Sequence, residues 1–109
     1  MNFQRTIKDY IEFEGVGLHN GKKVNLCLKP GEPNSGIQFK RTDVDFTKNI
    51  IEANYNNVSE PILCTKIKNS HGVTVSTVEH LMAAFYGEGV DNVIVEIDAP
   101  EVPIMDGSS

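Results

Sequence analysis

The stretch STVEHLMAAFYGEGVDNVIVEI, residues 76–97, carries the strongest structural pattern in this 109-residue chain. Its apolar side chains recur at the spacing of one helical face, namely Val78, Leu81, Met82 and Phe85. Ser76 and Glu79 have the spacing of a capping box, which predicts a helix with Ser76 as its N-cap. Gly87 and Gly89 are expected to end this helix.

Short segments with alternating or continuous apolar residues predict the strands of a sheet around this helix. They are residues 5–14, 24–29, 37–41, 50–53, 63–68, 73–75 and 93–97. Turn-rich residues 15–21 and 69–72 join their neighbours into antiparallel hairpins. Residues 93–97 are apolar enough for an interior position in the sheet. The sequence therefore predicts an α+β two-layer sandwich with a mostly antiparallel sheet and one helix.

The last residues indicate that the natural protein continues. Residues 106–109, Asp-Gly-Ser-Ser, are of the types that begin helices. A single helix would also leave much of one sheet face uncovered, and a sheet needs a second layer. We therefore expect a second helix that is truncated away.

Composition excludes several classes of function. The net charge is −5 and the basic residues are scattered, which argues against nucleic-acid binding. The longest uncharged run is far shorter than the roughly 18 apolar residues of a spanning helix. The start of the chain lacks an apolar signal core, so we expect a cytoplasmic protein. Cys27 and Cys64 form no CxxC pair and are expected to be reduced.

Glu79 and His80 are the first candidates for chemistry. On a helical wheel they point about 110° and 150° away from the apolar stripe, on a side that also holds Ala83 and Ala84. A capping box explains Glu79 equally well, and a lone helical histidine is often a surface residue. A catalytic zinc site needs three protein ligands, and the chain has three histidines in all. The residues alone leave the question open.

Four further residues have a structural interpretation, and two of them, His19 and Asp106, have a functional one as well. His19 lies in a glycine-rich turn whose N–H groups can meet an anion, although the residues alone favour a solvated turn histidine. Cys64 and Thr65 are explained by packing on a strand. Asp106 is either a helix cap or a catalytic group.

Taken together, five segments resemble the N-terminal domain of UDP-3-O-acyl-N-acetylglucosamine deacetylases, the zinc amidohydrolases of lipid A biosynthesis. The segments occur in the family's order and spacing at residues 14–21, 63–65, 76–84, 91–93 and 99–108. The resemblance implies two similar domains with the active site between their helix layers. Residues 1–109 would then be the N-terminal domain, incomplete at its C-terminus, and the second domain is absent.

The resemblance also implies roles for single residues. His80 matches a zinc ligand and Glu79 matches the general base. The matches that concern substrate are His19 at the phosphate end, Leu63, Cys64 and Thr65 along the cleft near the acetyl group, and Asp106 as a support of the site. The remaining zinc ligands and the passage for the acyl chain belong to the missing domain. The implied reaction removes the N-acetyl group of a UDP-sugar that carries an acyl chain, and the fragment alone is expected to be inactive.

Two other interpretations stay open. One is a non-catalytic α/β binding or interaction module that keeps the family fold, in which Glu79 is only a cap and His80 only a surface residue. The other is a zinc site completed by His19, His71 or Asp106, or by a second copy of the chain.

Overall fold

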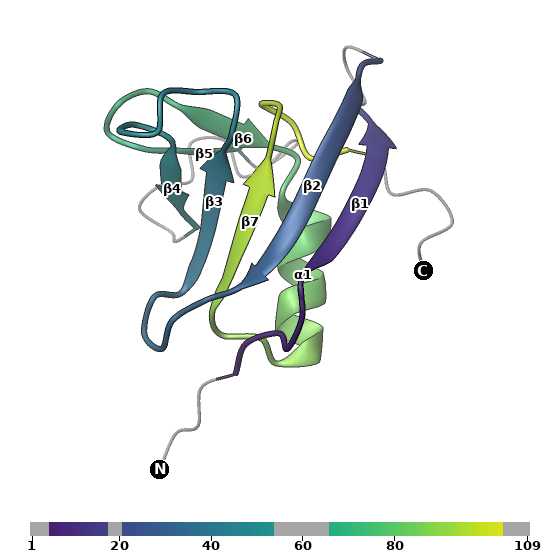
Figure 1. Cartoon of the computed structure of the whole chain (residues 1–109), viewed down its shortest axis with the longest axis vertical. Coiled ribbons are helices and arrows are strands. Elements are labelled where there is room, and N and C mark those ends of the chain that lie inside the picture. The colour runs from purple at the N-terminus through teal and green to yellow at the C-terminus, as the bar shows by residue number, and fades with distance from the viewer. Residues whose placement is uncertain (1–4, 18–20, 54–65, 104–109) are drawn as a thin grey trace.

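A computed structural model of the chain describes residues 5–17, 21–53 and 66–103. Figure 1 shows a twisted sheet with a helix on one side of it. The elements in chain order are β1 (Ile11–Val16), β2 (Lys23–Pro30), β3 (Ile37–Arg41), β4 (Ile50–Glu52), β5 (Lys66–Lys68), β6 (Thr74–Ser76), α1 (Glu79–Glu88) and β7 (Val93–Ile97). This arrangement confirms the predicted α+β class. The described part of the chain contains no helix with the length and hydrophobicity that a membrane span requires.

The main sheet has five strands in the order β1-β2-β7-β3-β4, and β5 pairs with β6 in a separate two-stranded sheet. Within the main sheet β7 is parallel to β3, and the other neighbouring pairs are antiparallel. The β1–β2 hairpin and the β5–β6 hairpin were both predicted. Strand β7 is last in sequence but central in the sheet, which fits its apolar composition.

The core lies between the helix and one face of the main sheet. Alternate residues of the strands point to this face because side chains of a strand alternate between two sides. The sheet contributes the buried side chains of Val24, Leu26, Leu28, Phe39, Ile51, Val93, Val95 and Ile97. Val78 and Phe85 belong to the same cluster, and Leu81 and Met82 pack against it. The predicted apolar stripe is therefore the inner face of the helical segment.

The opposite face of the sheet is polar. Lys29 and Glu96 form an ion pair with an N–O distance of 2.9 Å, and Asp98 accepts two hydrogen bonds from Asn25. Cys27 lies on this face as a free, half-buried thiol. Burial raises the pKa of Cys27, and the carboxylates of Glu12 and Glu96 raise it further. Cys64 lies outside the described residues.

Residues 5–10 do not form the strand that the sequence predicted, since β1 begins at Ile11. The carbonyl of Arg5 instead accepts the N–H groups of Asp91 and Asn92, at 2.9 and 3.0 Å. The Arg5 N–H donates to the carboxylate of Asp91 at 2.9 Å. These contacts tie the segment to the loop before β7, so its backbone groups are used outside the sheet.

The start of α1 also differs from the prediction. Ser76 belongs to β6, the N-cap is Val78, and no side chain caps the helix. Glu79 is the first helical residue, so it cannot fill the third position that a capping box requires. The other end agrees with the sequence, because Gly89 is the C-cap in the left-handed conformation at φ 71°. Gly87 lies inside the helix.

Candidate functional site

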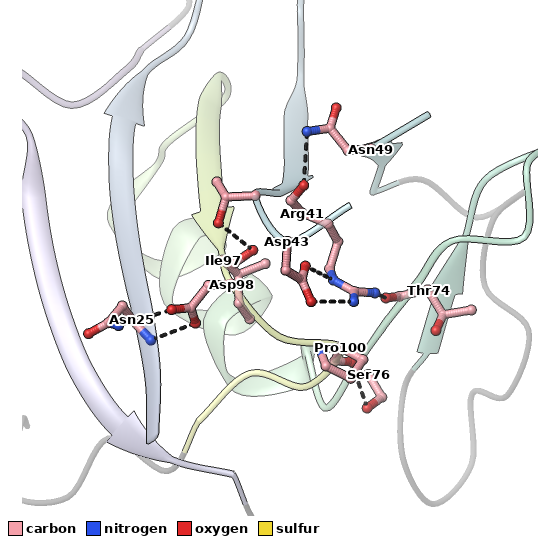
Figure 2. Close-up of polar contacts among 10 residues, drawn as sticks. Asn25, Arg41, Asp43, Asn49, Thr74, Ser76, Ile97, Asp98 and Pro100 are labelled. Carbon is pink, nitrogen blue, oxygen red and sulfur yellow. Dashed lines mark hydrogen bonds and ion pairs between the residues drawn. The ribbon is translucent and has the colours of Figure 1, made fainter. Parts of the chain in front are cut away.

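The candidate site is the junction where β6 passes into α1. Strand β6 is held from one side by Arg41, whose guanidinium donates to the carbonyl of Thr74 at 2.9 Å. The same edge of β6 is also held by Pro100, whose carbonyl accepts the Ser76 N–H at 2.8 Å and the Ser76 hydroxyl at 3.3 Å. Figure 2 shows these contacts on β6. These hydrogen bonds fix the end of β6, from which the chain continues into α1.

The turn between the two elements is strained. Thr77 has a φ of 62°, a left-handed conformation that is unfavourable for a β-branched residue. Its hydroxyl lies 3.4 Å from the Oε2 atom of Glu101, a residue that is only 5% exposed. Strained backbone of this kind persists where surrounding contacts hold it, and it is concentrated at functional sites.

Glu79 is the first residue after this turn, and its carboxylate is unusual. Its Oε2 atom is buried and has no hydrogen-bond partner in the structure, which describes residues 5–17, 21–53 and 66–103. A buried polar atom without a partner costs about 1–3 kcal/mol, and more when the group is charged. The capping role that could have explained this glutamate is absent. Glu79 is therefore a candidate proton acceptor whose oxygen is free for a ligand or water.

His80 follows directly and lies on the exposed side of α1. Ala83 and Ala84, one turn along, are exposed as well. The orientation predicted from the helical wheel is thus confirmed for all three residues. Small neighbours leave the imidazole accessible for coordination or for contact with another part of a protein.

A catalytic zinc ion would need more ligands than this junction supplies. Among the described residues no group of three His, Cys, Asp or Glu side chains is placed to hold a metal ion. His71 is exposed in the β5–β6 turn, where its N–H donates to the Oδ1 atom of Asn69. His80, next in sequence to the unpartnered Glu79 oxygen, could supply at most one ligand to such an ion.

The remaining predicted site residues cannot be placed. They lie outside the described ranges and are His19, Leu63, Cys64, Thr65 and Asp106.

Two residues at the junction were missed by the sequence analysis. The left-handed turn at Thr77 has no sequence signal, because residues that favour such a conformation are Gly, Asn and Asp. Glu101 did offer one, since it is an acid between Pro100 and the apolar residue Val102. A charge in such surroundings is either exposed or specifically paired.

The class that fold and site define is a two-layer α+β domain with a carboxylate and an imidazole at the start of its helix. Comparison with known proteins makes the assignment specific. The family model described as UDP-3-O-acyl N-acetylglycosamine deacetylase (LpxC) matches residues 4–109, and the chain belongs to this family.

Curated relatives agree with the family assignment. A UDP-3-O-acyl-N-acetylglucosamine deacetylase of Haemophilus influenzae is 53% identical over 106 residues. Proteins of the same name from Photobacterium profundum and Vibrio atlanticus are each 52% identical, over 110 and 106 residues. Each match covers 97% of this chain and 34% of the relative. The chain thus spans about a third of the length of the curated relatives it matches.

Proposed function

We propose that this chain is the N-terminal part of a zinc-dependent deacetylase. The substrate is UDP-3-O-acyl-N-acetylglucosamine, and the reaction hydrolyses its N-acetyl group in lipid A biosynthesis. The observation that carries the proposal is the buried Oε2 atom of Glu79, which lacks a partner among the described residues, in a chain of the deacetylase family. A carboxylate placed in this way can accept a proton without first breaking another contact.

In the proposed reaction water adds to the amide carbonyl carbon, and Glu79 accepts the proton that the water loses. The carbon–nitrogen bond then breaks as the leaving nitrogen takes up the proton that the water lost, which gives acetate and a free amine on the sugar. Positioned proton transfer of this kind typically contributes about 10²–10⁴-fold in rate.

His80 is the residue of this chain that would bind zinc. Its imidazole is exposed, and it is next to the base in sequence. The chemistry that zinc supplies when bound is acidification of water and polarisation of the amide carbonyl. The other ligands would come from the second domain, which would also meet the acyl chain. Contacts of His19, residues 63–65 and Asp106 with the substrate remain predictions, as does the cytoplasmic location.

The first test is the size of the protein in its source cells, measured by blotting with an antibody against this segment. A band well above twice 12 kDa is expected, because a third of the relatives' length is present here. A band at 12 kDa would show that no second domain is attached to this chain, and it would favour the interpretation as a non-catalytic binding module. The isolated 109-residue chain is expected to release no acetate, because its described residues hold no group of three metal-ligating side chains.

The second test uses the intact protein and measures acetate release. Glu79→Gln should reduce kcat by at least about 100-fold. Glu88→Gln is the matched control, because Glu88 is an exposed acid at the other end of the same helix. His80→Ala should lower the zinc content, measured by elemental analysis, whereas His71→Ala should leave it unchanged. Full activity in Glu79→Gln would refute the proposed base.

A further inference from the structure

A short segment after β7 packs along the strand-to-helix junction. Ser76 and Glu101 form an isolated parallel β-bridge. In this bridge the Ser76 N–H donates to the carbonyl of Pro100 at 2.8 Å, and the Val102 N–H donates to the carbonyl of Ser76 at 3.0 Å. The segment therefore reaches the last residue of β6, three positions before Glu79.

Glu101 is buried in this segment, with 5% of its surface exposed. Burying a carboxylate is costly, so we expect the charge of Glu101 to have a role that a neutral side chain could not fill. One of its contacts is with Thr77, whose hydroxyl lies 3.4 Å from the Glu101 Oε2 atom. The distance is long for a hydrogen bond, so this contact alone is weak. The position of this contact matters more than its strength, because it connects the Ser76–Glu101 bridge to the strained residue Thr77.

Thr77 decides the direction in which the chain enters α1. Its φ of 62° turns the backbone between Ser76, which is fixed by the bridge, and Val78, the N-cap. The Val78 carbonyl then accepts the N–H of Met82 at 2.9 Å, so the helix is regular from its first turn. A change in the Thr77 conformation would rotate or shift this first turn. Glu79 and His80 would move with it.

We propose that Glu101 and Thr77 are positioning residues for Glu79 and His80. The buried Glu101 carboxylate and the backbone bridge stabilise the left-handed conformation of Thr77. This conformation in turn sets the positions of Glu79 and His80. This inference rests on the proposed deacetylase function. Neither residue is proposed to contact the reacting atoms. Their effect on the reaction comes through the placement of Glu79, and a misplacement of about 1 Å can cost about 100-fold in rate.

The test measures kcat, KM and melting temperature of the intact deacetylase in four single variants and one double variant. Thr77→Val removes the hydroxyl and keeps the shape, and Glu101→Gln removes the charge and keeps the shape. Thr77→Ser keeps the hydroxyl and serves as the conservative rescue. Ser76→Ala is the matched control, since it removes a neighbouring hydroxyl bond of 3.3 Å and leaves the Thr77–Glu101 contact in place.

Thr77→Val and Glu101→Gln should each lower kcat by about 10-fold with KM within about 2-fold. Thr77→Ser and Ser76→Ala should stay within about 2-fold of the wild type in kcat. The double variant Thr77→Val/Glu101→Gln should lose no more than the worse single variant, because the two residues act as one unit. Melting temperature is expected to be similar in Thr77→Val and Ser76→Ala, so the difference in kcat cannot come from folding.

Retained kcat in Thr77→Val and Glu101→Gln would overturn the inference, and so would equal losses in Thr77→Val and Thr77→Ser. These outcomes leave the proposed function intact as long as Glu79→Gln is inactive. If the wild-type protein itself releases no acetate, the proposed function fails instead. The two failures are therefore distinguishable within one set of assays.

Discussion

Two regions of the molecule each contain a buried oxygen atom without a hydrogen-bond partner in the described structure. One is Asn49 Oδ1, near the ends of β3 and β4, and the other is Glu79 Oε2, at the start of α1. The surroundings of the two atoms differ. The Asn49 amide nitrogen donates to the carbonyl of Arg41 at 2.9 Å, so this side chain is held by its other half (Figure 2).

The region around Asn49 is otherwise paired. Arg41 donates two hydrogen bonds of 2.8 Å to the carboxylate of Asp43 and a third to Thr74. A neutral amide oxygen without a partner costs about 1–3 kcal/mol, which such contacts can offset. This region is built for stability, and its one unpaired atom belongs to a side chain with a clear structural use.

At the start of α1, by contrast, several features that are unfavourable for folding occur together. The unpaired oxygen belongs to a carboxylate, the helix begins without a side-chain cap, and Thr77 adopts a left-handed conformation. Each feature is unfavourable for folding, and they occur within three consecutive positions. Local departures from the rules of stability mark functional residues, because activity needs groups that folding would leave out. The comparison therefore separates a structural polar cluster from the cluster that we propose to be functional.

The largest expected effect on stability is that of Arg41→Ala. Arg41 is 9% exposed, and the substitution removes the two bonds to Asp43 and the bond to the Thr74 carbonyl. We expect a loss of about 2–3 kcal/mol in the free energy of unfolding, measured by chemical denaturation of the intact protein. Arg41→Lys should lose less, because it keeps the charge but not the paired geometry. An unchanged midpoint in Arg41→Ala would contradict a structural role for this cluster.

The next prediction compares the two unpaired atoms directly. Asn49→Ala removes the bond to the Arg41 carbonyl and should cost about 1–2 kcal/mol, with deacetylation per folded molecule unchanged. Glu79→Gln should leave stability unchanged or raise it by up to about 1 kcal/mol, because a neutral amide is cheaper to bury than a carboxylate. Thermal melts and acetate release on the same samples provide both readouts. A destabilised Glu79→Gln variant would show that Glu79 is structural and would remove the distinction.

Periodicity predicted the strands and the helix because their apolar residues alternate or recur on one face. It could not predict the insertion of β7 between β2 and β3, since that pairing joins residues far apart in sequence. The capping-box prediction failed for a related reason. Ser76 has a partner in Pro100, which local spacing cannot reveal, and this pairing delays the start of the helix to Glu79.

The candidate site followed from the sequence only in part. The orientation of His80 away from the core could be derived from helical geometry. The assignment of Glu79 as a base came from the family resemblance, because the residues alone allowed a cap. The burial of its Oε2 atom is a tertiary property, and the left-handed Thr77 contacts Glu101, which is 24 positions away in sequence. Those contacts have no local signature.

The smallest expected effect is a dependence of stability on acid. The Arg41 guanidinium holds the pKa of the Asp43 carboxyl below its ordinary value. The ion pair is therefore fully present above about pH 4, the range of an unfolded aspartate, and is lost as the pH falls through the lowered pKa of the folded state.

Asp43 is 36% exposed, so solvent screening limits its contribution to at most about 1 kcal/mol. Denaturation midpoints should fall more steeply below about pH 4 in the wild type than in Asp43→Asn. Glu79→Gln should keep the wild-type acid dependence from this pair, because Asp43 and Arg41 are intact in it. If Asp43→Asn instead shows the same slope as the wild type, the Arg41 cluster contributes little charge-dependent stability, and the contrast with the α1 junction rests on the neutral contacts of Asn49.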